Sequence, residues 1–179
     1  MKTGLILCLL AVGGAVIAEA AAAETKPLEV VPFVDIQKYL GTWYEIATIP
    51  QRFQKGCVGV TAEYKLRKDG DIEVINTCRQ ETLDGKVKTA HGKAWVVDKK
   101  TNAKLKVRFF WPFTGAYWII GLDADYRWAI VGHPNRNYLW ILSRTPHMDE
   151  ALYGELLNMI ANKGYDLAKI KKTLQPAGQ

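Results

Sequence analysis

The sequence predicts an all-β domain, an eight-stranded up-and-down antiparallel β-barrel with one C-terminal α-helix packed outside it. Three observations lead to this fold class. Runs of alternating apolar and polar residues recur between turn residues from position 42 to position 144. From position 149 onward the apolar residues instead take helical spacing. A Gly-Thr-Trp motif at 41–43 opens the first run and a Ser-Arg-Thr-Pro motif at 143–146 closes the last, so the two motifs bracket the strands.

Residues 1–23 are predicted to form a secretory signal peptide, which leaves residues 24–179 as a single domain. A basic start precedes an apolar core, and small residues ending at Ala20 and Ala23 offer two cleavage sites. The apolar stretch is too short for a stable membrane span. Cys8 lacks the small preceding residue that a lipoprotein cleavage site needs. We therefore expect an exported protein that is not lipid-anchored.

The elements of the domain follow in order. An extended segment from Pro27 to Pro32 leads into one helical turn at 34–39. Eight strands are then expected, at Thr42–Ile49, Val58–Leu66, Ile72–Arg79, Val87–Val97, Lys104–Phe110, Ala116–Leu122, Arg127–Gly132 and Tyr138–Arg144. Most intervening turns are short, so consecutive strands should pair antiparallel. The helix, from Asp149 to near Gly164, has one apolar face, which the outer wall of the barrel can cover.

Trp43 and Arg144 stand at opposite ends of the strand-rich part of the chain. A Trp ring has an electron-rich face, and Arg stacks on such a face while its donors remain free for nearby carbonyl groups. If the two side chains meet, they close one end of the barrel and leave the other end open as a pocket. The sequence thus predicts a barrel that is closed at one end and can hold a ligand in an internal pocket.

Cys57 and Cys78 flank a predicted hairpin turn at 68–71, in a protein whose expected compartment favours oxidation. Regular pairing about that turn would put Cys78 opposite Val60, so a disulfide needs a β-bulge, which Gly56 or Gly59 could supply. We expect the disulfide, with two free thiols as the alternative.

The charge pattern and the dispersed polar residues exclude several function classes. The net charge of +6 is scattered along the chain and includes no basic helix, so nucleic acid is not an expected partner. His91, His133 and His147 stand apart, which argues against a zinc site. Ser143 is the only serine after the signal peptide, and it lies in no Gly-x-Ser-x-Gly elbow. We expect no enzyme activity, no metal and no cofactor.

The chain resembles the lipocalins at three separate motifs. They are Gly-Thr-Trp-Tyr-Glu-Ile at 41–46, Leu-Asp-Ala-Asp-Tyr at 122–126 and Trp-Ile-Leu-Ser-Arg-Thr-Pro at 140–146, in the order the family has them. Within the family the chain is most similar to the bacterial outer-membrane lipocalins and apolipoprotein D, and more distantly to the plant temperature-induced lipocalins. The resemblance implies a structural role for Trp43 and Arg144 at the closed end.

The expected pocket combines alternation with this resemblance. If Arg144 points inward, so do Tyr138, Trp140 and Leu142, because strand side chains repeat every second residue. By the same argument Glu45, Ala47 and Ile49 should share the inward side of Trp43. The resemblance to apolipoprotein D adds further ligand-lining positions, which are Tyr64, Asn76, Phe109 and Tyr117, and it agrees on Trp140. Rings with a few polar atoms suit an acyl chain with a polar head.

An apolar cluster, Trp111-Pro112-Phe113, stands in a predicted loop. Four uses fit it: peripheral contact with a membrane, contact with a second subunit in a homodimer, capping of a bound ligand, or packing back onto its own barrel. A cation such as Lys93 is a further candidate, as the partner of a lipid phosphate or carboxylate.

The resemblance implies a protein that binds and transports or stores fatty acids or lysophospholipids at the cell envelope, in the periplasm and in association with the outer membrane. Two alternatives remain from other function classes. One is a lipid-modifying enzyme that uses Cys78 as a pocket nucleophile, which requires a free thiol. The other is a haem- or pigment-binding barrel, for which His91 is the candidate ligand.

Overall fold

The computed structural model describes residues 26–177, and the predicted signal peptide lies outside this range. Eight strands form a closed up-and-down antiparallel barrel, which confirms the predicted fold class. Their bounds are β1 Gly41–Thr48, β2 Cys57–Leu66, β3 Ile72–Gln80, β4 Val87–Val96, β5 Lys104–Phe110, β6 Phe113–Leu122, β7 Trp128–Gly132 and β8 Leu139–Ser143. Each strand pairs with its neighbour in sequence, and β1 pairs with both β2 and β8 to close the ring.

The connection between β5 and β6 is tighter than the sequence predicts. Pro112 and Gly115 suggest a turn over 112–115, but Phe110 pairs directly with Phe113, so only Trp111 and Pro112 lie between the strands. The register of the β5–β6 pair shifts between Val107 and Phe110, so a β-bulge or similar irregularity lies just before the turn. The two strands therefore project as a narrow hairpin with aromatic residues at its tip.

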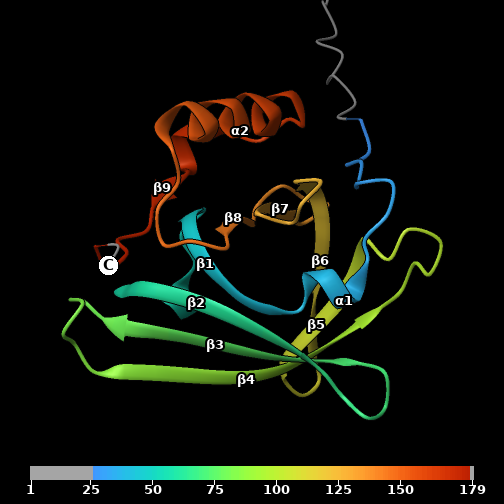
Figure 1. Ribbon diagram of the computed structural model, residues 1–179, viewed down its shortest axis with the longest axis horizontal. Helices are drawn as coiled ribbons and strands as arrows, with labels where there is room; N and C mark the ends of the chain where they lie inside the picture. The colour runs from blue at the N-terminus through green and yellow to red at the C-terminus, as the bar shows by residue number, and fades with distance from the viewer. Residues whose placement is uncertain (1–25, 178–179) are drawn as a thin grey trace, which may run out of the picture.

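Helix α2, Glu150–Asn162, covers the outside of the barrel as predicted (Figure 1). The side chain of Asp149 accepts hydrogen bonds from the N–H groups of Ala151 and Leu152 and so caps the first turn. Leu156 and Ile160 of α2 are buried. They pack against the outward-facing side chains of four strands, which are Ile46, Ile120, Ile130 and Ile141. A second apolar cluster fills the barrel interior around Trp43, Tyr64 and Ile119.

An irregularity in β1 changes which of its side chains face the interior. Glu45 lies opposite Leu142, but the next paired residue is Ala47, opposite Ile141, so one extra residue is inserted at this point. The inward alternation therefore ends at Glu45. Ala47 and Ile49 pack in the outer cluster beneath α2, and the prediction that they face the interior was wrong.

The disulfide between Cys57 and Cys78 is present, with the two Cα atoms 5.5 Å apart. Regular pairing of β2 with β3 is interrupted between Val58 and Thr61, as the bridge requires. Gly59 adopts φ +57° within this interruption, a left-handed conformation that favours glycine. The predicted disulfide and the predicted bulge are thus confirmed together.

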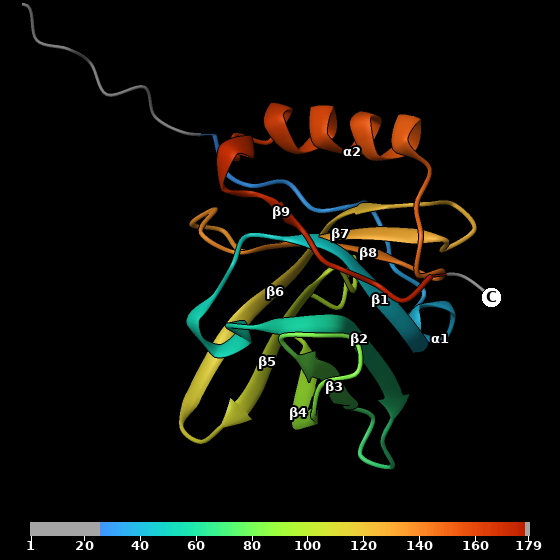
Figure 2. The same ribbon diagram turned by 90° about the vertical axis from the view of Figure 1, so that its left-hand side faces the viewer.

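The end of the chain adds a short strand that the sequence analysis did not predict. Strand β9, Lys171–Lys172, pairs with β1 at Ala47 and Thr48. In Figure 2 the C-terminal segment crosses the barrel alongside β1. Beyond it, the backbone N–H of Gly59 in β2 donates to the carbonyl of Leu174 at 2.7 Å. Residues 171–175, here called the tail, therefore fill the seam where β1 and β2 no longer pair.

The barrel has one closed and one open end. Helix α1, Ile36–Tyr39, lies just before β1 and covers the closed end. In an up-and-down barrel alternate connections share an end, so the β1–β2, β3–β4, β5–β6 and β7–β8 connections surround the open end. Within residues 26–177 no helix is long and apolar enough to cross a membrane.

Candidate ligand-binding site

Arg144 closes the floor of the barrel over Trp43. The guanidinium carbon lies 3.8 Å from the centroid of the Trp43 ring, and so stacks on its face. The guanidinium also donates to three backbone carbonyls, of Thr42 at 2.9 Å, Lys38 at 2.7 Å and Tyr126 at 3.2 Å. Arg144 thereby joins the start of β1, the end of α1 and the β6–β7 connection, and has no nucleophile or base beside it in this contact set.

Three tyrosine hydroxyls form a chain in the interior above the floor. The hydroxyl of Tyr117 lies 2.8 Å from that of Tyr39 and 2.8 Å from that of Tyr64. Burial raises the pKa of Tyr64 to about 12, and burial likewise raises the pKa of Tyr39 and Tyr117 well above the usual value. All three stay protonated at neutral pH. Three hydroxyl protons serve two hydrogen bonds within the chain, so one proton remains for another acceptor.

Tyr64 and Tyr117 were predicted from the sequence to line the ligand site, whereas Tyr39 was not. Tyr39 belongs to α1, and its carbonyl oxygen accepts the indole N–H of Trp43 at 2.8 Å. A signal was present, since Tyr39 is an aromatic residue four positions before Trp43. The sequence could not show that a helix outside the strands would supply an interior side chain.

The other predicted pocket residues lie farther from the floor, toward the open end of the barrel. Phe109, Trp140 and Leu142 pack in or against the interior cluster. Phe109 lies so close to β4 that a Cβ on Gly92 would come within 2.8 Å of its ring. Asn76, opposite Ala90 in β4, has a buried Oδ1 without a hydrogen-bond partner among the described residues. An acceptor of this kind favours a ligand that offers a donor.

Tyr138 stands just before β8 and stacks on Trp140, with ring centroids 6.2 Å apart. The predicted pocket residues thus come from five strands, which are β2, β3, β5, β6 and β8. Whether these residues contact a ligand stays a prediction.

A buried carboxylate links the interior to the tail, and the sequence analysis did not assign it a role. Glu45 is only 4% exposed. Its Oε2 accepts from Nε2 of Gln54 at 2.9 Å, and its Oε1 accepts from the Thr173 hydroxyl at 2.5 Å. Gln54 in turn accepts the indole N–H of Trp140 at 3.2 Å. Burial raises the pKa of Glu45, and the hydrogen bonds from Thr173 and Gln54 oppose that rise. The available signal was a carboxylate at an inward position of the first strand.

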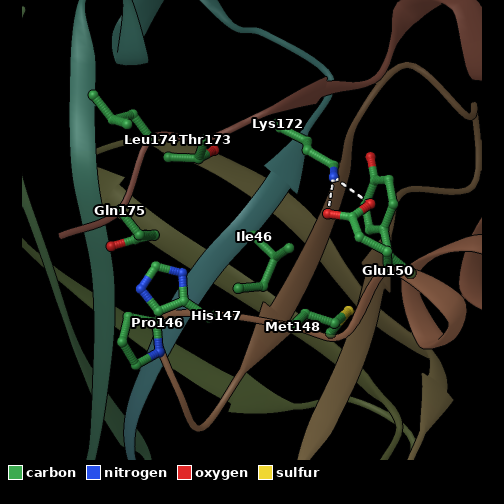
Figure 3. Close-up of a pocket in the computed structure, with 10 residues that line it drawn as sticks. Ile46, Pro146, His147, Met148, Glu150, Lys172, Thr173, Leu174 and Gln175 are labelled. Atoms are coloured by element: carbon green, nitrogen blue, oxygen red, sulfur yellow. Dashed lines mark hydrogen bonds and ion pairs between the residues drawn. The ribbon is translucent and has the colours of Figure 1, made fainter. Parts of the chain in front are cut away.

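Two cavities flank the tail. One, of about 410 Å³, lies between the tail, β1 and the segment that leads into α2. Figure 3 shows that Lys172 points across it to Glu150, with which it forms an ion pair of 2.6 Å. The other, of about 500 Å³, lies between the tail and the β1–β2 connection, which contains the short 3₁₀ helix η1, Arg52–Gln54. Glu45 and Gln54 line this second cavity, which therefore adjoins the barrel interior at Trp140.

The open end carries large exposed aromatic side chains. Phe110, Trp111 and Phe113 at the β5–β6 tip are 75%, 81% and 76% exposed, and Phe53 in the β1–β2 connection is 70% exposed. The alternative in which the Trp111-Pro112-Phe113 cluster packs back onto its own barrel is therefore wrong, because a two-residue turn holds these rings away from the wall.

The structure excludes three residues from the functional roles that were considered for them. Cys78 is bonded to Cys57 and offers no thiol nucleophile. His91 lies opposite Ile75, on the outward side of β4, and so faces away from the interior where a haem would bind. Lys93 is paired with Asp69 and Asp71 in the β2–β3 turn at the closed end, so it is not a cation of the pocket rim. Residues 26–177 contain no group of three metal-ligating side chains.

Comparisons with known proteins agree with the fold. A family model described as a lipocalin-like domain matches residues 34–175. Temperature-induced lipocalin-1 of Arabidopsis thaliana is 43% identical over 161 residues, which cover 85% of each chain. Outer membrane lipoprotein Blc of Escherichia coli K12 is 43% identical over 159 residues, 88% of this chain and 89% of the relative. Insecticyanin from Manduca sexta superposes with a TM-score of 0.65 at 18% identity, over 82% of this chain and 83% of its own.

Proposed function

Because this chain belongs to the lipocalin family, whose members bind small hydrophobic ligands, we propose that it binds fatty acids or lysophospholipids in its barrel. It transports or stores these lipids at the cell envelope and acts as a binding protein rather than as an enzyme. The observation that carries the proposal is the composition of the interior, where rings and aliphatic side chains form one continuous apolar cluster.

Acyl-chain burial supplies enough free energy for this function. Each buried methylene contributes about 0.8 kcal/mol, so roughly ten of them give about 8 kcal/mol, which corresponds to micromolar affinity. The unpartnered Oδ1 of Asn76 and the remaining proton of the tyrosine chain supply the few polar contacts. The predicted ligand-contacting residues are Tyr64, Asn76, Phe109, Tyr117, Tyr138, Trp140 and Leu142.

The proposed location is the periplasm, in association with the outer membrane but without a lipid anchor. The predicted signal peptide and the disulfide support export, because disulfides persist in oxidising compartments. The exposed aromatic residues at the open end support peripheral membrane contact, since such rings favour the bilayer interface. Contact with a membrane at this end would let a lipid enter the barrel directly.

Native mass spectrometry of protein purified from its host tests the ligand. We expect a bound species whose released mass identifies a fatty acid or lysophospholipid. Titration with lysophospholipid should quench the fluorescence of the wild-type protein, and Trp140→Phe should lose the largest part of that change. An empty barrel together with an unresponsive fluorescence spectrum would contradict the proposal.

Membrane contact has a separate test. The double variant Trp111→Ser/Phe113→Ser should sediment less with anionic vesicles than the wild type, while it retains lysophospholipid binding in solution. Leu66→Ser/Val97→Ser, which removes two exposed apolar side chains at the closed end, is the matched control. Sedimentation equilibrium of the same variants reports whether the aromatic cluster instead pairs two copies of the chain.

A further inference from the structure

The cavity of about 500 Å³ beside the tail is lined by cations from two separate segments. Arg52 and Lys55 come from the β1–β2 connection, and Lys171 and Lys172 come from the tail. Lys172 forms an ion pair with Glu150 on the other side of the tail. Within residues 26–177, Arg52, Lys55 and Lys171 have no ion-pair partner within 4 Å.

One carboxylate, Glu45, also lines this cavity, and it forms no ion pair with the cations. Both oxygens of Glu45 already accept hydrogen bonds, from Gln54 and from Thr173. Three unpaired cations against one carboxylate leave the cavity with a net positive charge. A concave surface with charge of one sign concentrates ions of the opposite sign.

The cavity also adjoins the place where a ligand chain would leave the barrel. Gln54 lines the cavity and accepts the indole N–H of Trp140, which packs against the interior cluster. Thr48 lines the cavity as well and lies opposite Trp140 in the β1–β8 pair. Gln54 is therefore the side chain that lies between the barrel interior at Trp140 and the cations of this cavity.

We propose that this cavity binds the phosphate-bearing headgroup of an anionic lysophospholipid whose acyl chain occupies the barrel. The inference rests on the proposed lipid-binding function and refines it. A liquid water molecule occupies about 30 Å³, so the cavity has room for a whole glycerophosphate group and not only for the carboxylate of a fatty acid. Arg52 provides planar paired donors, and the two lysines provide point charges, which together suit phosphate oxygens.

The test compares two lipids with the same acyl chain, below their critical micelle concentrations. One is anionic lysophosphatidylglycerol and the other is neutral monoacylglycerol. We expect the wild type to bind the anionic lipid about tenfold more tightly at low salt, because each exposed cation contributes modestly. The preference should shrink at 0.3 M NaCl, where the Debye length falls to roughly 5 to 6 Å.

The variant Arg52→Gln/Lys55→Gln/Lys171→Gln should lose the preference and retain monoacylglycerol binding. Its matched control is Lys68→Gln/Lys99→Gln/Lys100→Gln, which removes the same charge from connections at the closed end. The control variant should retain the preference, which separates a local site from the field of the whole protein.

Four results would overturn the inference. Equal affinity of the wild type for the two lipids would do so, as would a preference that survives in the cavity variant. Glycerol 3-phosphate that binds as tightly as the lysolipid would make the cavity a site for free phosphate esters. In these three cases the barrel still binds lipid and the proposed function stands. Failure of both lipids to bind would overturn the proposed function as well.

Discussion

Gln175 joins two strands that do not pair with each other at this height of the barrel, since its Nε2 donates to the carbonyl of Glu45 in β1 at 2.8 Å and to that of Val60 in β2 at 2.9 Å. The side chain is 8% exposed and so makes these bonds away from bulk water. Closure of the barrel therefore depends on a residue after its last long strand.

Gln175→Ala should lower the free energy of unfolding by roughly 2 to 4 kcal/mol, because two buried carbonyls lose their donor. Urea denaturation followed by far-UV circular dichroism measures the effect. Leu174→Ala, at the adjacent residue whose side chain is 55% exposed, is the control and should change the midpoint little. Equal effects of the two substitutions would contradict the role of the Gln175 amide.

Arg144→Lys should destabilise the protein by roughly 2 to 4 kcal/mol. A lysine cannot reproduce the planar contact with Trp43 together with hydrogen bonds to three separate carbonyls. Arg127→Lys, which changes an exposed arginine paired with Asp123, serves as the control and should leave the urea midpoint almost unchanged. If Arg144→Lys also left the urea midpoint unchanged, a positive charge alone would be sufficient at this position and the planar contact with Trp43 would not contribute to stability.

Tyr117→Phe should cost more stability than Tyr64→Phe. The first substitution removes the middle hydroxyl of the chain and leaves two buried hydroxyls without their partner, whereas the second leaves the Tyr39–Tyr117 bond intact. We expect losses of about 2 to 3 kcal/mol and about 1 kcal/mol respectively, measured by thermal and urea unfolding. The reverse order would show that the hydroxyl chain is not formed in solution.

The pH dependence of stability should contain a contribution from Glu45. Burial raises its native pKa above the usual value of 4.5, so between the two values the native state binds more protons than the unfolded state. The contribution of Glu45 to the free energy of unfolding therefore falls as pH rises through that window, and it does not change further above the native pKa. Glu45→Gln should remove this contribution, which urea midpoints at several pH values above 4.5 would reveal by comparison with the wild type.

Replacement of both cysteines, Cys57→Ser/Cys78→Ser, should lower stability by roughly 3 kcal/mol, as the loss of a bridge across 21 residues of sequence implies. Reduction of the wild type with dithiothreitol should give a similar shift in the urea midpoint, and should leave the variant unchanged. Before reduction, folded protein that lacks residues 1–23 should not react with Ellman's reagent, because both of its cysteines are in the disulfide.

Much of the fold follows from local pattern. The alternation of apolar residues located all eight strands, and the change to helical spacing located α2. The disulfide was expected from two cysteines in an oxidising compartment, and counting residues about the turn at 68–71 predicted the bulge that it requires. These features depend on residues close to each other in sequence, whose geometry is fixed by the backbone repeat.

The predictions that were wrong, and the strand that was not predicted, concern features that depend on long-range pairing. Alternation placed Ala47 and Ile49 inside, but the inserted residue in β1 is set by pairing with β8, almost a hundred residues away. The short tail strand carries no alternation to detect, because only Lys171 and Lys172 pair with β1. Lys93 was predicted as a cation for a lipid headgroup, but the fold of the β2–β3 turn pairs it with Asp69 and Asp71.

The sequence by itself determined eight strands, one covering helix and the residue types of the floor, and it favoured a bridge between Cys57 and Cys78. Only the tertiary structure decided that Tyr39 joins the interior, that Glu45 and Gln54 separate the interior from a cationic cavity, and that the tail completes the wall. The physical reason is that strand and helix periods arise from local backbone geometry, whereas a seam between β1 and β2 exists only after the sheet has closed on itself.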